Sequence, residues 1–166
     1  MAVTTQYSPE YNQDKQAPHV GAMDQNAYRR VTLPFNFVQG AAAGDIASIC
    51  KLRHLPPGRI MFFPLESYIA WEAFGAARTL DIGFEAYTEP DNDAVAADDN
   101  LFDDDIDVSS AGGAALGSDY TQANAANTGG MREFWSKEGV SIVATVAGDT
   151  IPAATNLTGY LTIGIL

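Results

Sequence analysis

Acidic side chains dominate the residues that could do chemistry in this sequence. Twelve of the twenty-one Asp and Glu residues lie between positions 79 and 131, where the chain has no Lys or Arg. Oxygen-rich clusters of this kind can coordinate calcium, and a pair of carboxylates on rigid elements can hydrolyse a glycosidic bond. The twelve acids are Asp81, Glu85, Glu89, Asp91, Asp93, Asp98, Asp99, Asp103, Asp104, Asp105, Asp107 and Asp119.

The densest groups of acids are DNDAVAADDN at 91–100 and DDDID at 103–107. Neither has the glycine that an EF-hand loop requires at its sixth position, and paired-acid catalysis requires two carboxylates in fixed positions. Three interpretations stay open: a solvated acidic face, a structural cation site and a contact with a basic partner. We favour the solvated face and expect no bound metal or other cofactor.

Few other residues have the chemistry of a catalytic site. His19 lies in an unpatterned N-terminal stretch and His54 in a Pro-rich turn, and neither has a Ser or Cys in a nucleophile-like context. Cys50, the single cysteine, has apolar neighbours and is predicted to be a small buried hydrophobe. The GGAALG run at 112–117 lacks the strand, helix and Lys of a phosphate-binding loop. We therefore expect no catalytic residues and no enzyme.

Aromatic side chains crowd the middle of the chain. They could form a platform that stacks on carbohydrate, but at this spacing they are more typical of a hydrophobic core. The aromatic residues in question are Phe62, Phe63, Tyr68, Trp71, Phe74, Phe84 and Tyr87.

The formal net charge of −12 resides entirely in the acidic segment, because the rest of the chain has nine acids against nine basic residues. Such a protein repels nucleic acid, so we expect no nucleic-acid partner. No apolar run reaches the length of about 18 residues that a membrane span requires, and no signal-peptide pattern opens the chain. We expect a soluble protein made in the cytoplasm, with no membrane partner.

The elements that must position these residues read as short β-strands. In the stretch 28–39, Val31, Leu33, Phe35 and Phe37 alternate with smaller or polar residues, and Pro34 favours an edge strand or a bulge over a central strand. The stretch 65–74 is compatible with a helical turn, but we favour a strand because its surroundings are β-rich. The expected strands are residues 28–39, 45–52, 59–63, 65–74, 79–88, 140–146 and 157–166.

Two segments lack this alternation. Residues 1–27 are polar and unpatterned, so they form either a frayed terminus or an extended arm that orders against a neighbouring subunit. Residues 89–130 are expected to form a long acidic loop, with a short strand piece at 101–108 and a small helical turn near 119–126.

Seven or eight strands without a strand–helix–strand rhythm favour two packed antiparallel sheets. We predict an all-β fold: a jelly-roll-like antiparallel β-sandwich with an extended N-terminal arm and a long acidic loop. The predicted organisation is an arm at 1–27 and a single β-sandwich domain at 28–166. At 166 residues, the chain is long enough for one core of ordinary size.

The stretch LPPGRIMFFPLESYIAWEAFGAARTLDIGFEAYTEPDNDAVAADDNLFDDDIDVSSAGGAALG resembles small structural proteins from the head-gene region of tailed bacteriophages. The shared pattern is an L-P-x-G turn, a central strand, an R-T-L-D-I-G-like strand and an acidic A-V-A-A-D segment, between about residues 29 and 117. The resemblance implies a virion protein, in particular a capsid decoration (cement) protein. Such proteins are frequently β-rich and act as trimers or dimers on the capsid exterior.

On this resemblance the expected partners are the major capsid protein and further copies of the same chain, and the expected location is the capsid exterior of the virion. A head–tail or tail component is a second interpretation. A carbohydrate-binding module for host recognition is a third and a hydrolase a fourth.

Overall fold

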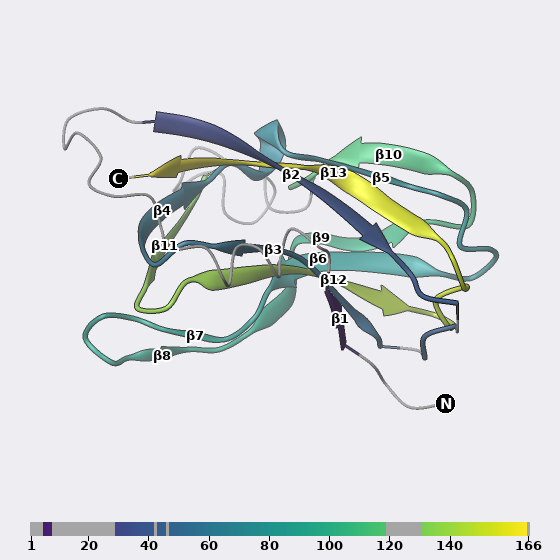
Figure 1. Cartoon of the computed structure of the whole chain (residues 1–166), viewed down its shortest axis with the longest axis horizontal. Helices are drawn as coiled ribbons and strands as arrows, with labels where there is room; N and C mark the ends of the chain where they lie inside the picture. Colours follow the sequence, from purple (N-terminus) through teal and green to yellow (C-terminus); the bar gives the residue numbers. More distant parts are fainter. Residues whose placement is uncertain (1–4, 8–28, 42, 46, 119–130, 166) are drawn as a thin grey trace.

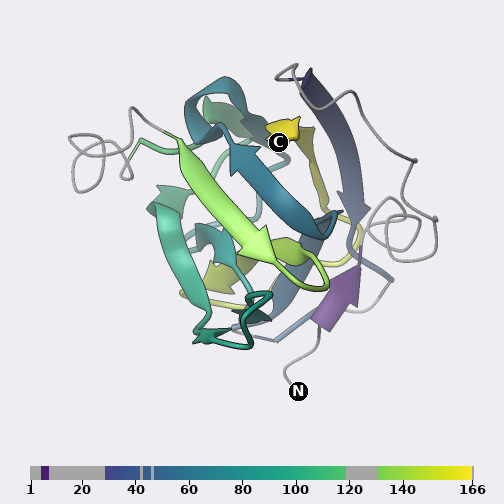
Figure 2. The ribbon, with the colours of Figure 1, turned by 90° about the vertical axis from the view of Figure 1, so that its left-hand side faces the viewer.

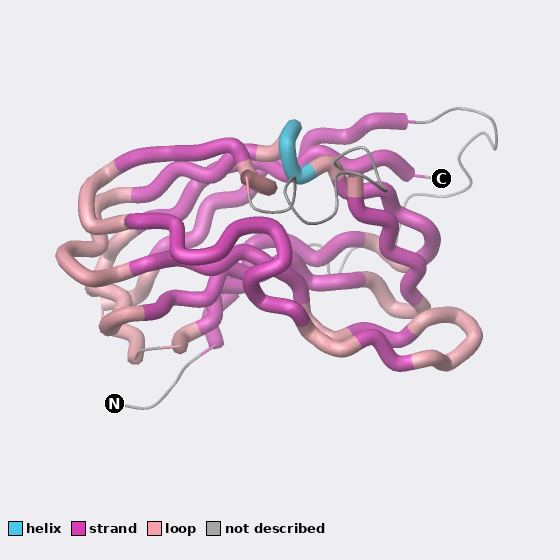
Figure 3. Tube along the Cα trace, turned by 180° about the vertical axis from the view of Figure 1, so that it is seen from behind, coloured by secondary structure: helices cyan, strands magenta, loops and turns pink. Residues whose placement is uncertain are grey.

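A computed structural model describes residues 5–7, 29–41, 43–45, 47–118 and 131–165 of the chain. Within these residues the chain forms two β-sheets that lie face to face (Figure 1). Strands make up most of the described chain (Figure 3), and the one helical element is a single 3₁₀ turn, η1 (Pro64–Glu66). The prediction of an all-β sandwich is confirmed.

Sheet A carries the acidic side of the molecule. All of its neighbouring strands are antiparallel except β1, which pairs parallel with β3. In spatial order its strands are β1 (Thr5–Tyr7), β3 (Ile49–Leu55), β12 (Val140–Ala147), β6 (Thr79–Phe84) and β9 (Asp98–Asp107).

Sheet B is built around the last strand, which pairs with one strand on one side and with two shorter strands, placed end to end, on the other. Its strands are β2 (Arg29–Val38), β13 (Asn156–Ile165), β4 (Gly58–Phe62), β5 (Tyr68–Trp71), β11 (Arg132–Ser136) and β10 (Gly112–Ala115). A separate small hairpin joins β7 (Tyr87–Thr88) to β8 (Ala94–Val95).

The pairing pattern is that of a jelly roll. The strand β2 pairs with β13, β3 with β12, the β4 and β5 pair with β11 and β10, and β6 with β9. Each earlier strand of the chain in this series thus pairs with a later one, which makes one long antiparallel ribbon. The ribbon folds over so that each sheet receives four of its strand positions. The predicted jelly-roll-like arrangement is confirmed by this order.

The core lies between the sheets, and in strands such as β2 and β3 alternate residues point inward. Figure 2 shows the two sheets from the side that is on the left in Figure 1. Aromatic rings from both sheets interlock in the core. The Phe62 and Phe102 ring centroids are 4.8 Å apart, those of Phe84 and Phe134 are 5.3 Å apart, and Tyr87 packs beside Phe134. The edge-on geometry of these pairs is the arrangement that aromatic quadrupoles favour.

The prediction of a long acidic loop at 89–130 is wrong for its described part. Residues 98–107 form β9, a ten-residue strand paired with β6, and Gly112–Ala115 form β10. This acidic segment can form a strand because β9 is an edge strand: Phe102 is buried, whereas Asp99, Asp104, Asp105 and Asp107 stay exposed to water. The strand piece expected at 101–108 is therefore real but begins earlier.

Strand β3 (Ile49–Leu55) begins and ends later in the sequence than the strand expected at 45–52. Ser48 donates from both its amide and its hydroxyl to the carbonyl of Asp45, and Ala47 has φ of 61°, so this part is a turn. Strand β3 then runs through His54, which the sequence placed in a turn. Only two prolines separate β3 from β4, with Gly58 at φ of 105° supplying the reversal.

Two other predicted strands have different boundaries in the structure. Residues 65–74 begin in the η1 turn, and only Tyr68–Trp71 pair as a strand. The strand expected at 79–88 divides into β6 and β7, because Ala86 faces solvent and Tyr87 turns inward. Strand β11 was not expected. The strands predicted at 28–39, 59–63, 140–146 and 157–166 match β2, β4, β12 and β13.

Within the described residues, Pro34 lies on an edge strand as predicted, because β2 pairs with β13 alone. Of the predicted arm at 1–27, Thr5–Tyr7 are described and pair with the chain's own β3. The division between arm and domain stays a prediction, and the helical turn expected near 119–126 lies outside the described residues. No helix in the described chain is long and apolar enough to cross a membrane.

Candidate functional site

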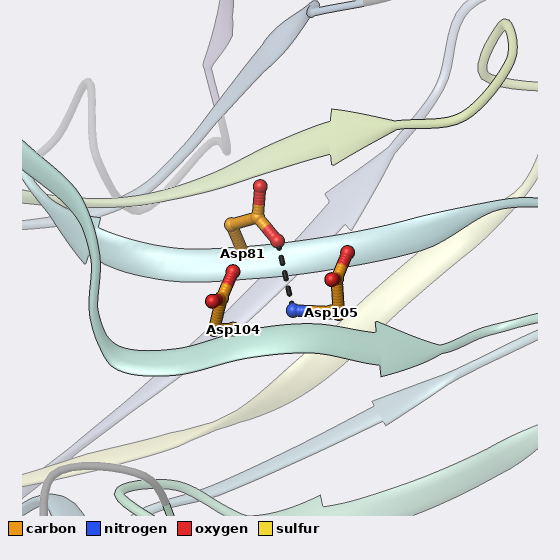
Figure 4. Close-up of side chains that lie close together, drawn as sticks. All are labelled: Asp81, Asp104 and Asp105. Carbon is orange, nitrogen blue, oxygen red and sulfur yellow. Dashed lines mark hydrogen bonds between the residues drawn. The ribbon is translucent and has the colours of Figure 1, made fainter.

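A cluster of three carboxylates lies on the outer face of sheet A. Asp81 belongs to β6, and Asp104 and Asp105 belong to β9 (Figure 4). The ladder pairs Leu80 with Ile106 and Ile82 with Asp103, so two residues of β9 oppose Asp81 alone. This is a β-bulge, and it brings three acids to one spot on the surface.

Backbone geometry and two hydrogen bonds shape this cluster. Asp105 has φ of 56°, a left-handed conformation that Asp tolerates better than most residues. Its amide donates to Asp81 Oδ1 at 3.0 Å, and the Thr79 hydroxyl donates to Asp105 Oδ1 at 3.0 Å. One carboxylate oxygen of each acid lies within 4.8 Å of the other two, so the three can offer a cation one ligand each.

The electrostatics of the cluster are unfavourable at neutral pH. Partial burial raises the pKa of Asp81 above its ordinary value, and the negative charges of Asp104, Asp105 and Asp99 raise it further, against the lowering effect of the Asp105 amide. A solvated face, a cation site and a basic partner would each accommodate this repulsion. The expectation that no metal is bound stays a prediction.

Asp81→Asn is expected to raise the melting temperature at pH 7 by about 1–2 °C, because it removes one of three crowded charges. The amide oxygen can still accept the Asp105 amide. Since the folded-state pKa of Asp81 is raised, the folded protein binds this proton more readily than the unfolded chain. Wild-type stability from this group therefore increases as pH falls through the range just above 3.8, and the advantage of the variant should shrink there.

Thermal melts of both proteins between pH 4 and pH 7 measure this effect. Asp107→Asn is the matched control on β9, since the Ser109 amide lowers the pKa of Asp107 and gives the opposite sign. A variant at Asp81 that melts below the wild type at pH 7 would show that the cluster is not repulsive.

Asp103 belongs to the same acidic run but is buried, with a relative exposure of 1%. It accepts hydrogen bonds from the Gly117 amide at 2.7 Å, the Ser118 amide at 2.9 Å and the Ser118 hydroxyl at 2.6 Å. A carboxylate with three such donors holds the chain that follows β10 against β9. The DDDID run thus contains one structural acid followed by the two exposed acids of the cluster.

The opposite outer face, that of sheet B, has a different character. All five large hydrophobic side chains that are exposed among the described residues lie on it, with exposures of 38–52%. Cross-strand partners share a face, so the register and the alternation of burial place the four on strands outward. Leu65 lies on η1, which a hydrogen bond from the Thr162 hydroxyl to the Glu66 carbonyl joins to the same side of β13. We call this surface the sheet B outer face; its exposed hydrophobics are Val38 (β2), Leu65 (η1), Tyr68 (β5), Trp135 (β11) and Tyr160 (β13).

Two tyrosines form the centre of this surface. Tyr160 pairs with Pro34 on one side and with Tyr68 on the other, and Tyr68 pairs with Ala115. The Tyr68 and Tyr160 rings are stacked, with centroids 6.2 Å apart and planes 25° apart. A side chain at Gly113 would collide with the Tyr68 hydroxyl, so this glycine leaves room for the ring.

Charges on the sheet B outer face occur as pairs. Arg30 Nη1 lies 2.7 Å from Glu66 Oε2, and Arg59 forms an ion pair with Glu133 across β4 and β11. Exposed pairs of this kind contribute little to stability. Because these charges are paired, the sheet B outer face combines apolar rings with balanced charge, whereas the excess of acidic residues lies on sheet A.

The remaining candidate residues are structural in their surroundings. His54 is 5% exposed, and its Nδ1 and Nε2 lie 3.3 Å from Ser141 Oγ and 3.0 Å from the Glu138 carbonyl oxygen, so it ties β3 to the start of β12. Burial raises the pKa of the Cys50 thiol to about 12, which fits the predicted buried hydrophobe. The GGAALG run contains strand β10, and His19 lies outside the described residues.

The aromatic residues divide between the two interpretations. Phe62, Phe63, Phe74, Phe84 and Tyr87 are buried as predicted for a core. Trp71 is partly buried and donates to the Ser110 carbonyl, and Tyr68 is exposed. Sequence reasoning missed Tyr160 and Trp135 as surface residues. The signal in β13 was available, since the apolar alternation there leaves Tyr160 on the other face.

Comparison of the sequence with protein families and with curated proteins gave no match. Among solved structures, the fold is similar to a chain of the cyanophage Pam1 capsid asymmetric unit, with a TM-score of 0.52 and 11% sequence identity. The similarity covers 91% of this chain and 95% of that one, so the two chains are of nearly equal length. At this identity the likeness is one of fold, and it extends over nearly the whole of both chains.

Proposed function

We propose that this chain is a bacteriophage virion structural protein, and specifically a capsid decoration protein that stabilises the head by bridging capsid subunits. The observation that carries the proposal is the likeness of almost the whole jelly roll to a chain of a phage capsid asymmetric unit. It agrees with the resemblance of residues 29–117 to phage head proteins. In this proposal the protein has no catalytic role and no cofactor.

The two outer faces support such a role. A decoration protein requires a stiff scaffold, a contact surface and a soluble exposed side. The sheet B outer face has exposed tyrosines, which are enriched at protein interfaces, and the sheet A face has an excess of carboxylates. The proposed partners are the major capsid protein and further copies of this chain, on the capsid exterior.

The test is binding to phage capsids that lack this protein. We expect saturable binding and a higher rupture temperature of the decorated heads, because a bound bridge stabilises the assembled state by mass action. Light scattering and electron microscopy during a temperature ramp measure both. Heads that neither bind the protein nor gain heat resistance would contradict the decoration role and favour a head–tail or tail component.

A carbohydrate-binding role in host recognition is the second candidate, and the exposed Tyr68 and Tyr160 pair favours it. Aromatic faces of this kind can stack on sugar rings. Trp135 lies on the same face and is 42% exposed, so a glycan that covers its part of the face would quench its fluorescence. Saturable quenching in a glycan screen would favour this role.

A further inference from the structure

We infer that copies of this chain associate with each other through the sheet B outer face. The inference deepens the proposed function, since it rests on the expected homo-oligomer and names its surface. The occupant of the face is a second copy of the same chain.

The apolar content of the face is the first reason. Five large hydrophobics spread over β2, η1, β5, β11 and β13 converge on one side of the molecule, and the described part of sheet A exposes none. Single exposed hydrophobics are ordinary, but a concentration of them on one face marks an interaction surface. The stacked Tyr68 and Tyr160 form its centre, and Tyr is among the residues enriched at interfaces.

The size of the face is the second reason. Strands β2 and β13 have ten residues each and run side by side along their full length. Ten residues span about 33 Å, and four strand positions span roughly 19 Å, which gives a footprint of roughly 600 Å² before side-chain relief is added. Two such footprints bury about 1,200 Å² in total, which is the lower end of the range for specific interfaces. The face is therefore large enough for a contact of modest affinity between two copies.

The distribution of charge favours the sheet B outer face over the sheet A face for contact between two copies. The sheet B outer face presents both signs, with Arg30 beside Glu66 and Arg59 beside Glu133. When this face approaches another copy, each Arg can also meet the Glu of the other chain. The sheet A face presents Asp81, Asp104 and Asp105 together, and two such surfaces repel. Self-association through sheet B leaves the acidic side outward.

The test is the mass of the full-length protein in solution, measured by multi-angle light scattering at about 10–100 µM, a range suited to associations of micromolar Kd. We expect a mass of two chains or more. Tyr160→Glu places a charge at the centre of the contact and is expected to give monomers over the whole range. Leu65→Glu, on η1 at the same face, should also weaken the association. Circular dichroism and melting curves establish that each variant is folded.

Asn100→Glu is the matched control, because it adds the same charge to an exposed position on β9 of sheet A. It is expected to leave the mass unchanged. A wild-type monomer at 100 µM, or an oligomer that folded Tyr160→Glu and Leu65→Glu leave intact, would overturn the inference.

Capsid binding, measured separately on the same samples, distinguishes this inference from the proposed function. An oligomer that ignores capsids supports the contact and contradicts the decoration role. A wild-type monomer that binds capsids, and loses this binding in Tyr160→Glu, assigns the face to the capsid and overturns self-association.

Discussion

Phe102→Ala is expected to lower the free energy of unfolding by about 3–5 kcal/mol, as for other large-to-small substitutions in a core. Phe102 is fully buried, and its ring packs 4.8 Å from the centroid of Phe62 and 6.5 Å from those of Phe84 and Phe134. Removing it leaves a cavity between sheets A and B and deletes the ring that connects them. Urea unfolding monitored by far-ultraviolet circular dichroism measures the loss.

Leu101→Ala is the matched control, because Leu101 is the preceding residue on β9 and is only partly buried. Leu101→Ala should lower the free energy of unfolding by much less than Phe102→Ala, since it removes less buried apolar surface. The comparison tests the strand itself: a flexible acidic loop would tolerate both changes equally. Equal and small losses for the two variants would show that β9 is not a core strand.

Asp103→Ala is expected to lower the free energy of unfolding by about 2–4 kcal/mol. The carboxylate is buried and accepts three hydrogen bonds from Gly117 and Ser118. Without it the buried Gly117 amide loses its partner, whereas the donors of the exposed Ser118 can turn to water. The cost thus comes mainly from one orphaned amide and the broken charge-assisted bonds.

Asp99→Ala is the control for Asp103→Ala, since Asp99 is an exposed acid on the same strand. It should change the free energy of unfolding by no more than about 0.5 kcal/mol. Hydrogen exchange adds a second measurement, because Asp103→Ala should speed exchange of the Gly117 amide while leaving β13 protected. Similar unfolding energies for the two variants would contradict the anchoring role of Asp103.

The fold class was accessible from local sequence because alternation of apolar and polar residues is a local property. Val31, Leu33, Phe35 and Phe37 predict the strand that the structure places at the edge, and Pro34 predicts the edge. Of the predicted core aromatics, Phe62 and Phe84 are buried, and Phe84 follows from the same period. The choice of a jelly-roll-like sandwich followed from many short one-sided strands with no helices between them.

The acidic segment shows where local reasoning failed. Charge density predicted a loop, because strands seldom carry four acids within five residues as in DDDID, but an edge strand can keep charged side chains in water. The apolar residues Phe102 and Val108 were the weaker signal, and both are fully buried. This segment forms a strand because it pairs with the edge of β6. No local sequence pattern shows whether such an edge is present.

By itself, then, the sequence determined the class of fold, the exclusion of Pro34 from a central strand and the concentration of negative charge between positions 79 and 131. Only the tertiary structure decided which residues share a surface. The bulge opposite Asp81 depends on the β6–β9 register, and the face with Tyr68 and Tyr160 depends on the pairing of β5 with β13. Both arise from contacts between residues far apart in the chain, which strand periodicity cannot specify.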